Sequence, residues 1–146
     1  MTTVEADFIA PKNAASILLD TTANATITPF QQKFTSPVMY NGTAVATITA
    51  VLTTHQGINY LSVPTFSFTT LVASTATCAL LTGHFVPINT SKFLNLVVNS
   101  NGAQQWGSVQ IDTTGTLTFY PDTAGSNWTS QSTNSVFGRV IKYKSQ

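Results

Sequence analysis

Apolar and polar side chains alternate with a period of two along most of this chain of 146 residues. From Thr43 to Leu52, one parity carries alanine, isoleucine and leucine, and the other carries threonine and valine. Such alternation with β-branched residues predicts a strand, because successive side chains point to opposite faces of a sheet. No long segment has the period of an amphipathic helix, and Ala14–Asp20 is only a short, weak helix candidate. The chain is therefore predicted to be all-β.

Turn-forming residues separate the alternating segments. Asn41-Gly42 favours a two-residue turn and predicts a hairpin over Phe34–Leu52. Asn99–Gly102 and Asp112–Gly115 predict two further turns, and residues 121–134 form a polar loop. Further strands are expected over Ile58–Val63, Thr65–Thr69, Thr77–Leu81, Phe93–Val98, Trp106–Ile111, Thr116–Tyr120 and Val136–Tyr143, with Pro64 at a bulge or a sheet edge. Roughly nine or ten closely spaced strands in one domain predict a jelly-roll β-sandwich of two antiparallel sheets over residues 34–146.

Charged residues are scarce, and none occurs from Phe34 through Ser91. Asp, Glu, Lys and Arg make up 8% of the chain, against about 25% in an ordinary soluble domain. The net charge of +1 provides no electrostatic footprint for nucleic acid or an anionic membrane. A monomeric sandwich normally carries charges on its outer edges, where they block pairing with neighbouring strands. We therefore expect an obligate oligomer. The alternative is that the hydroxyl groups of Thr and Ser hydrate the surface of a monomer well enough without charges.

Residue patterns for catalysis or metal binding are nearly absent. Asp112 and Asp122 flank one predicted hairpin, and turn formation is favoured over a catalytic carboxylate pair. His55 and His84 lack a cysteine or carboxylate at ligand spacing. Cys78 lies in an apolar strand, which favours a buried and inert thiol. The sequence thus predicts no catalytic residues, no metal and no cofactor, and hence a protein that is not an enzyme.

Two aromatic residues on one predicted strand are candidates for a subunit interface. Phe66 and Phe68 share one face of this strand, where they serve the core or a contact between subunits. We expect them near the symmetry axis of the predicted oligomer. Trp106 follows two glutamines at the start of another strand and fits either the core or the rim.

Trp128 differs from the other aromatic residues because it lies in the polar loop, between Asn127 and Thr129. An indole among amides and hydroxyls is typical of a surface on which a sugar stacks. It is also typical of a loop anchored by one buried aromatic residue; this second interpretation is favoured, and both stay open. Under the first, Tyr120, Asn127, Trp128 and Thr129 form the ligand site, with Tyr120 as a second stacking plane.

The second half of the chain carries a series of short motifs. They are Phe85-Val-Pro87, Phe93 to Val98, Gly107-Ser-Val-Gln-Ile-Asp112, Gly115 to Phe119, Asn127-Trp128 and Val136 to Tyr143. In this order they resemble the C-terminal head domains of bacteriophage and large-virus fibres, which have the jelly roll of the tumour-necrosis-factor and complement type. The resemblance extends over residues 57–146.

The resemblance implies a homotrimer in a virion, made in the host cytoplasm. Its partners would be other virion proteins and a host surface glycan or protein, and its role receptor attachment or capsid decoration. Residues 1–33 would then be the end of a shaft or an anchor, and they lack the pattern of a signal peptide. Neither nucleic-acid binding nor membrane insertion is expected. The alternatives are a monomeric carbohydrate-binding module and a cupin-type enzyme, which the missing His/Glu metal ligands disfavour.

Overall fold

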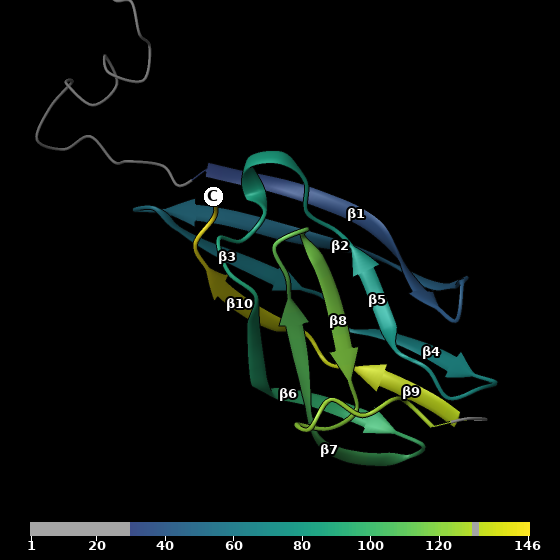
Figure 1. Ribbon diagram of the computed structural model, residues 1–146. Coiled ribbons are helices and arrows are strands. Elements are labelled where there is room, and N and C mark those ends of the chain that lie inside the picture. The colour runs from purple at the N-terminus through teal and green to yellow at the C-terminus, as the bar shows by residue number, and fades with distance from the viewer. Residues whose placement is uncertain (1–29, 130–131) are drawn as a thin grey trace, which may run out of the picture.

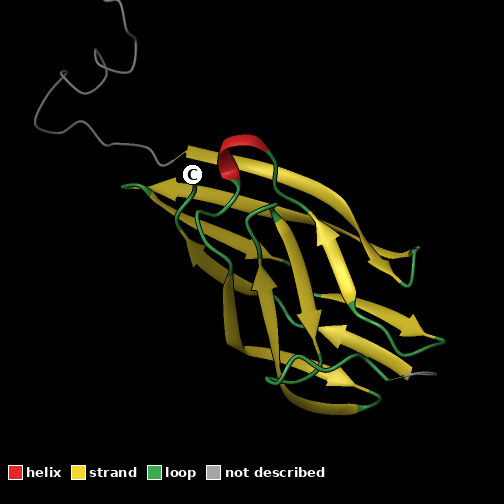
Figure 2. Ribbon diagram, viewed as in Figure 1, coloured by secondary structure: helices red, strands yellow, loops and turns green. Residues whose placement is uncertain are grey.

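A computed structural model describes residues 30–129 and 132–146 of the chain. The described part contains ten strands and one short helical turn, η1 (Gly83–Phe85) (Figure 2). The strands are β1 (Phe30–Tyr40), β2 (Thr43–His55), β3 (Ile58–Val63), β4 (Phe66–Thr70), β5 (Ala76–Ala79), β6 (Ser91–Ser100), β7 (Ala103–Ile111), β8 (Thr116–Tyr120), β9 (Ser132–Val136) and β10 (Arg139–Tyr143). The all-β prediction is confirmed for these residues. The helix candidate Ala14–Asp20 lies outside them.

The strands form one antiparallel sheet in the order β10-β3-β2-β1-β5-β8-β7-β6-β9-β4. This sheet curls strongly, so that β4 at one edge packs against β2 in the other half (Figure 1). The prediction of two separate sheets differs from this arrangement, because β5 pairs with both β1 and β8 and joins the halves by hydrogen bonds. The concave side encloses the core.

Three hairpin turns form where the sequence predicts them, and a further one, at Gln56 and Gly57 between β2 and β3, was not predicted. Asn41 and Gly42 both have positive φ, 50° and 79°, as the two-residue turn between β1 and β2 requires. Asn101 and Gly102 repeat this geometry between β6 and β7, with φ of 52° and 83°. In the turn between β7 and β8, the Asp112 carboxylate accepts hydrogen bonds from Thr114 and Thr116. Strand pairing is thus set locally at three places.

The structure corrects the predicted strand over Val136–Tyr143. Two strands occupy this region: β9 begins within the predicted polar loop and ends at Val136, and β10 begins at Arg139. Between them the chain crosses from one half of the sheet to the other, beside the crossing from β3 to β4. The Gly138 N–H donates to Thr65 Oγ1 at 2.8 Å, and a Cβ on Gly138 would lie 3.1 Å from the Val63 carbonyl oxygen. Two crossings packed this closely explain a glycine there.

Pro64 lies in the first of these crossings. It follows the end of β3, which pairs with β2 and β10, and precedes β4, which pairs with β9 at the far edge of the sheet. Pro64 therefore introduces an edge strand and does not form a bulge.

Candidate functional site

Trp128 is a buried anchor of its loop. Its side chain is 0% exposed, and its indole Nε1–H donates to the Phe119 carbonyl at 2.8 Å. The Phe68 ring meets the indole edge to face, with centroids 5.0 Å apart. The Trp128 backbone N–H also donates to the Ser74 carbonyl at 2.9 Å. These contacts agree with the buried-anchor interpretation, and the indole has no exposed face on which a sugar could stack.

The residues on either side of Trp128 are exposed. Asn127 and Thr129 flank the buried indole, and the Asp122 carboxylate organises the preceding turn. Asp122 Oδ1 accepts hydrogen bonds from the Gly125 N–H at 2.8 Å and the Ser126 N–H at 3.0 Å. Hydrogen bonds from Ser126, above all from its side chain, and from Gly125 hold the pKa of Asp122 below its usual range. These hydrogen bonds fix the turn that precedes Trp128.

Tyr120 lies on the opposite side of the sheet from Trp128. It pairs with Ser108 of β7, whereas its neighbour Phe119 faces the core and receives the Trp128 hydrogen bond. The Lys92 ammonium lies 5.0 Å from the centroid of the Tyr120 ring. Tyr120 and Trp128 consequently do not face a common ligand.

Phe66 and Phe68 belong to the core of a single chain. They are 7% and 4% exposed, and the Phe66 ring meets the Phe119 ring at 5.0 Å between centroids. The Phe68 ring also contacts Tyr40, with centroids 5.8 Å apart. The curl of the sheet folds β4 over the strands that carry these partners. The structure thus buries Phe66 and Phe68 in the core of one chain, and not at the subunit contact that the sequence analysis predicts for them.

Trp106 is the exposed counterpart of Trp128. It stands on β7 opposite Val97 of β6, and 62% of its surface is exposed. Val97, Gln104, Gln105 and Trp106 line a shallow hollow of about 240 Å³. The sequence does not decide whether Trp106 belongs to the core or the rim, and the structure places it on the outer surface. The two preceding glutamines could not decide its position, since Trp128 also has polar neighbours and is buried.

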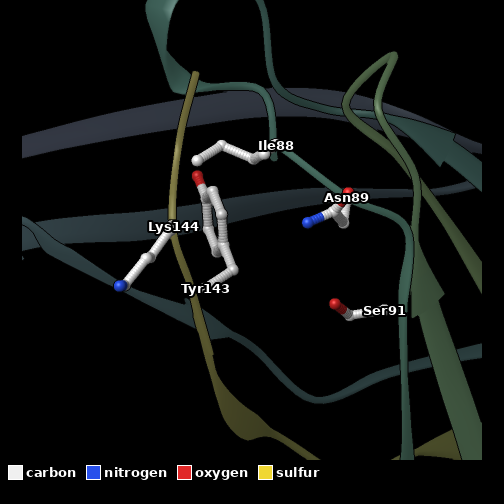
Figure 3. Close-up of a pocket in the computed structure, with 5 residues that line it drawn as sticks. All are labelled: Ile88, Asn89, Ser91, Tyr143 and Lys144. Atoms are coloured by element: carbon white, nitrogen blue, oxygen red, sulfur yellow. The ribbon is translucent and has the colours of Figure 1, made fainter.

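A second hollow, of about 210 Å³, lies where the C-terminal residues pair with the segment before β6 (Figure 3). The Asn89 and Ser91 side chains point toward the Tyr143 ring across the gap, whereas the Lys144 ammonium points away from them. The Tyr143 hydroxyl donates to the Phe85 carbonyl at 2.6 Å, and burial raises the pKa of Tyr143 above its usual value. The side chains that face this hollow, Asn89, Ser91 and Tyr143, are neutral and polar, and none of them is positioned as a general acid or base.

A third hollow, of about 350 Å³, lies beside the turn between β1 and β2. Leu71 and Val72 form part of its lining and are 82% and 44% exposed. Large apolar side chains are therefore exposed at two separate places on the protein: Leu71 and Val72 at this hollow, and Trp106 on β7.

The candidate catalytic groups do not form an active site in the described part of the chain. Asp112 and Asp122 lie at opposite ends of β8, each engaged in its own turn. The Cys78 thiol is buried, which raises its pKa, as its apolar strand predicts. Within residues 30–129 and 132–146, no three His, Cys, Asp or Glu side chains gather as metal ligands. None of the helices described there is long and apolar enough to cross a membrane.

Comparison with known proteins gives a likeness in structure and none in sequence. No protein-family model matches the chain, and no curated protein matches its sequence. Among solved structures, it is similar to the reovirus attachment protein sigma1, crystallised in complex with α-2,3-sialyllactose. The TM-score is 0.45 and the identity 14%, and the match covers 79% of this chain and 66% of that chain. A third of the sigma1 structure thus has no counterpart here, and a likeness of this size provides no basis for assigning a ligand.

Proposed function

We propose that this protein is a non-enzymatic, homotrimeric head domain of a virion, which attaches the particle to a glycan or protein on a host surface. The sequence resemblance to the heads of phage and large-virus fibres supports this function. A jelly roll of the tumour-necrosis-factor type is part of the proposal, and the two adjacent crossings between the sheet halves support it. Attachment needs a rigid scaffold with an exposed binding surface, which the curled sheet and its exposed Trp106 supply.

The proposed oligomer rests on one observation, the low charge of the outward face of β1, β2, β3 and β10. Its cross-strand rows consist of hydroxyl, amide and apolar side chains, with Lys33 and Lys142 as its charged members. On this face, the hydroxyls of Thr35 and Thr49 share a hydrogen bond of 2.8 Å. Val140 on β10 is 54% exposed and lies in the row that continues through Ser62 of β3 and Val51 of β2. An outer face with so little charge is suited to burial between identical subunits.

The proposed interface is tested by placing a charge on this face. We expect the purified full chain to have three times the mass of a monomer by sedimentation or light scattering. Closed threefold symmetry buries this face in each copy, so Thr49→Lys should dissociate the trimer to monomers. High salt should leave the wild-type trimer intact, since screening acts on charges and this face has few.

Ser67→Lys is the matched control. Ser67 on β4 shares an exposed hydroxyl hydrogen bond of 2.8 Å with Ser135, as Thr49 does with Thr35, but it lies on the other half of the sheet. We expect Ser67→Lys to remain trimeric. A wild-type monomer at micromolar concentration would contradict the proposed oligomer and favour the alternative of a monomeric carbohydrate-binding module.

A further inference from the structure

We propose that Trp106 and the carboxamide of Gln104 form a binding site for a neutral sugar ring at the end of a glycan. This inference rests on the proposed attachment function and names the ligand chemistry of its surface. The proposed stacking residue is thus Trp106 on the hairpin of β6 and β7, in place of Trp128 in its loop.

The first step is the position of the indole. Trp106 is 62% exposed on β7, where it pairs with Val97 of β6, and from Ser108 onward the same strand also pairs with β8. Val97, directly opposite on β6, lines the same hollow. The C–H face of a sugar ring suits such an aromatic plane, because the face of the indole carries negative charge density and its body is apolar.

The second step is the carboxamide of Gln104. Gln104 is exposed and stands opposite Asn99, so a pair of amides lies next to the row of Trp106 and Val97 on the same face of the sheet. Gln105, between them in the sequence, stands opposite the buried Val98, and its Nε2 donates a hydrogen bond to the Pro121 carbonyl on the other face. A carboxamide both donates and accepts, as do the adjacent hydroxyls of a sugar.

The third step is charge. None of the four lining residues is charged. The Arg139 guanidinium donates to the Asn95 carbonyl of β6 and lies over the Phe93 ring. The Lys92 ammonium lies over the Tyr120 ring, and the Asp122 carboxylate accepts hydrogen bonds within its own turn. The hollow therefore lacks a partner for an anionic group, and its chemistry favours a neutral ring over a sialic acid.

The fourth step is size. At about 240 Å³ the hollow lies below the volume of about 300–1,000 Å³ that drug-sized ligands occupy. A hollow of this volume suits one sugar ring. A single site of this kind binds near the millimolar range, and three copies on one head raise the avidity about 100-fold on a multivalent surface.

The experiment uses the full chain with ¹⁵N-labelled tryptophan and titrates it with lactose and with α-2,3-sialyllactose. The two indole N–H signals separate the sites, because Trp106 is exposed and the Trp128 N–H is buried against Phe119. We expect lactose to shift the Trp106 signal and leave the Trp128 signal in place. Sialyllactose should bind no more tightly than lactose, since no cation lines the hollow.

Variants test the assignment. Trp106→Ala should weaken lactose binding at least tenfold, and Gln104→Ala should weaken it less. Leu71→Ala is the control, because it removes an apolar side chain that is 82% exposed in a different hollow and should leave lactose binding unchanged.

Two results would overturn the sugar site. One is a Trp106 signal that neither sugar moves at tens of millimolar. The other is a Trp106 signal that moves on dilution without sugar, which would place Trp106 between copies of the chain. Oligomeric mass and cell attachment are measured in parallel. A trimer that attaches to cells without a response at Trp106 removes this inference alone, whereas a monomer that attaches to nothing removes the proposed function.

Discussion

The two tryptophans of this protein have similar sequence surroundings and opposite structural roles. Trp106 follows two glutamines and is 62% exposed, and Trp128 stands between asparagine and threonine and is 0% exposed. Trp128 contacts Phe68 and Phe119, which lie far from it in the sequence or on another strand, whereas Trp106 projects from the outer face of its own hairpin. Polar neighbours therefore do not tell whether an aromatic residue binds a ligand. The deciding factor is the face of the sheet to which the chain delivers it.

The largest expected effect is the loss of the buried indole. Trp128→Ala removes a fully buried ring and its hydrogen bond to Phe119, so we expect the free energy of unfolding to fall by about 3–5 kcal/mol. Urea denaturation followed by far-ultraviolet circular dichroism measures this change.

Trp128→Phe separates the ring from its hydrogen bond. It keeps an aromatic ring in the core but leaves the Phe119 carbonyl without its donor, which should cost about 1–3 kcal/mol. A Trp128→Ala protein as stable as the wild type would show that Trp128 is not an anchor.

A smaller effect is expected from the turn that leads to Trp128. Because hydrogen bonds from Ser126 and Gly125 lower the folded-state pKa of Asp122, its contribution to stability is complete above the unfolded pKa of about 3.9. This contribution disappears as the pH falls through the lower folded-state pKa. Asp122→Asn should thus be less stable than the wild type at pH 7, by under about 1 kcal/mol because the group is solvent-exposed. The difference should shrink toward pH 2.

Urea denaturation of both proteins at pH 7 and pH 2.5 checks this prediction. A difference that stays constant over this range would assign the effect to the lost side-chain geometry and not to the carboxylate charge.

The smallest effect on folding is expected at the exposed tryptophan. Trp106→Ala removes little buried surface, so the free energy of unfolding should change by no more than about 0.5 kcal/mol. The same urea denaturation as for Trp128→Ala provides the direct contrast. A loss comparable to that of Trp128→Ala would mean that Trp106 is covered in the assembled protein.

Local structure was predictable from neighbouring residues alone. The bounds of β3 and β8 and the turns at Asn41-Gly42, Asn101-Gly102 and Asp112–Gly115 follow the sequence pattern. The physical reason is that side-chain alternation and the positive φ of a tight turn are properties of a few consecutive residues. The buried thiol of Cys78 was predictable in the same way, from its apolar strand.

The tertiary structure decided what lies far apart in the sequence. The division between β9 and β10 at Gly138 depends on the crossing at Thr65, and the burial of Phe66 and Phe68 depends on the curl that brings β4 over Phe119 and Trp128. Alternation shows that two side chains share a face, but the same pattern arises whether that face meets the chain's own core, another subunit or a ligand. Only the path of the whole sheet distinguishes these, and it makes Trp128 an anchor and leaves Trp106 exposed.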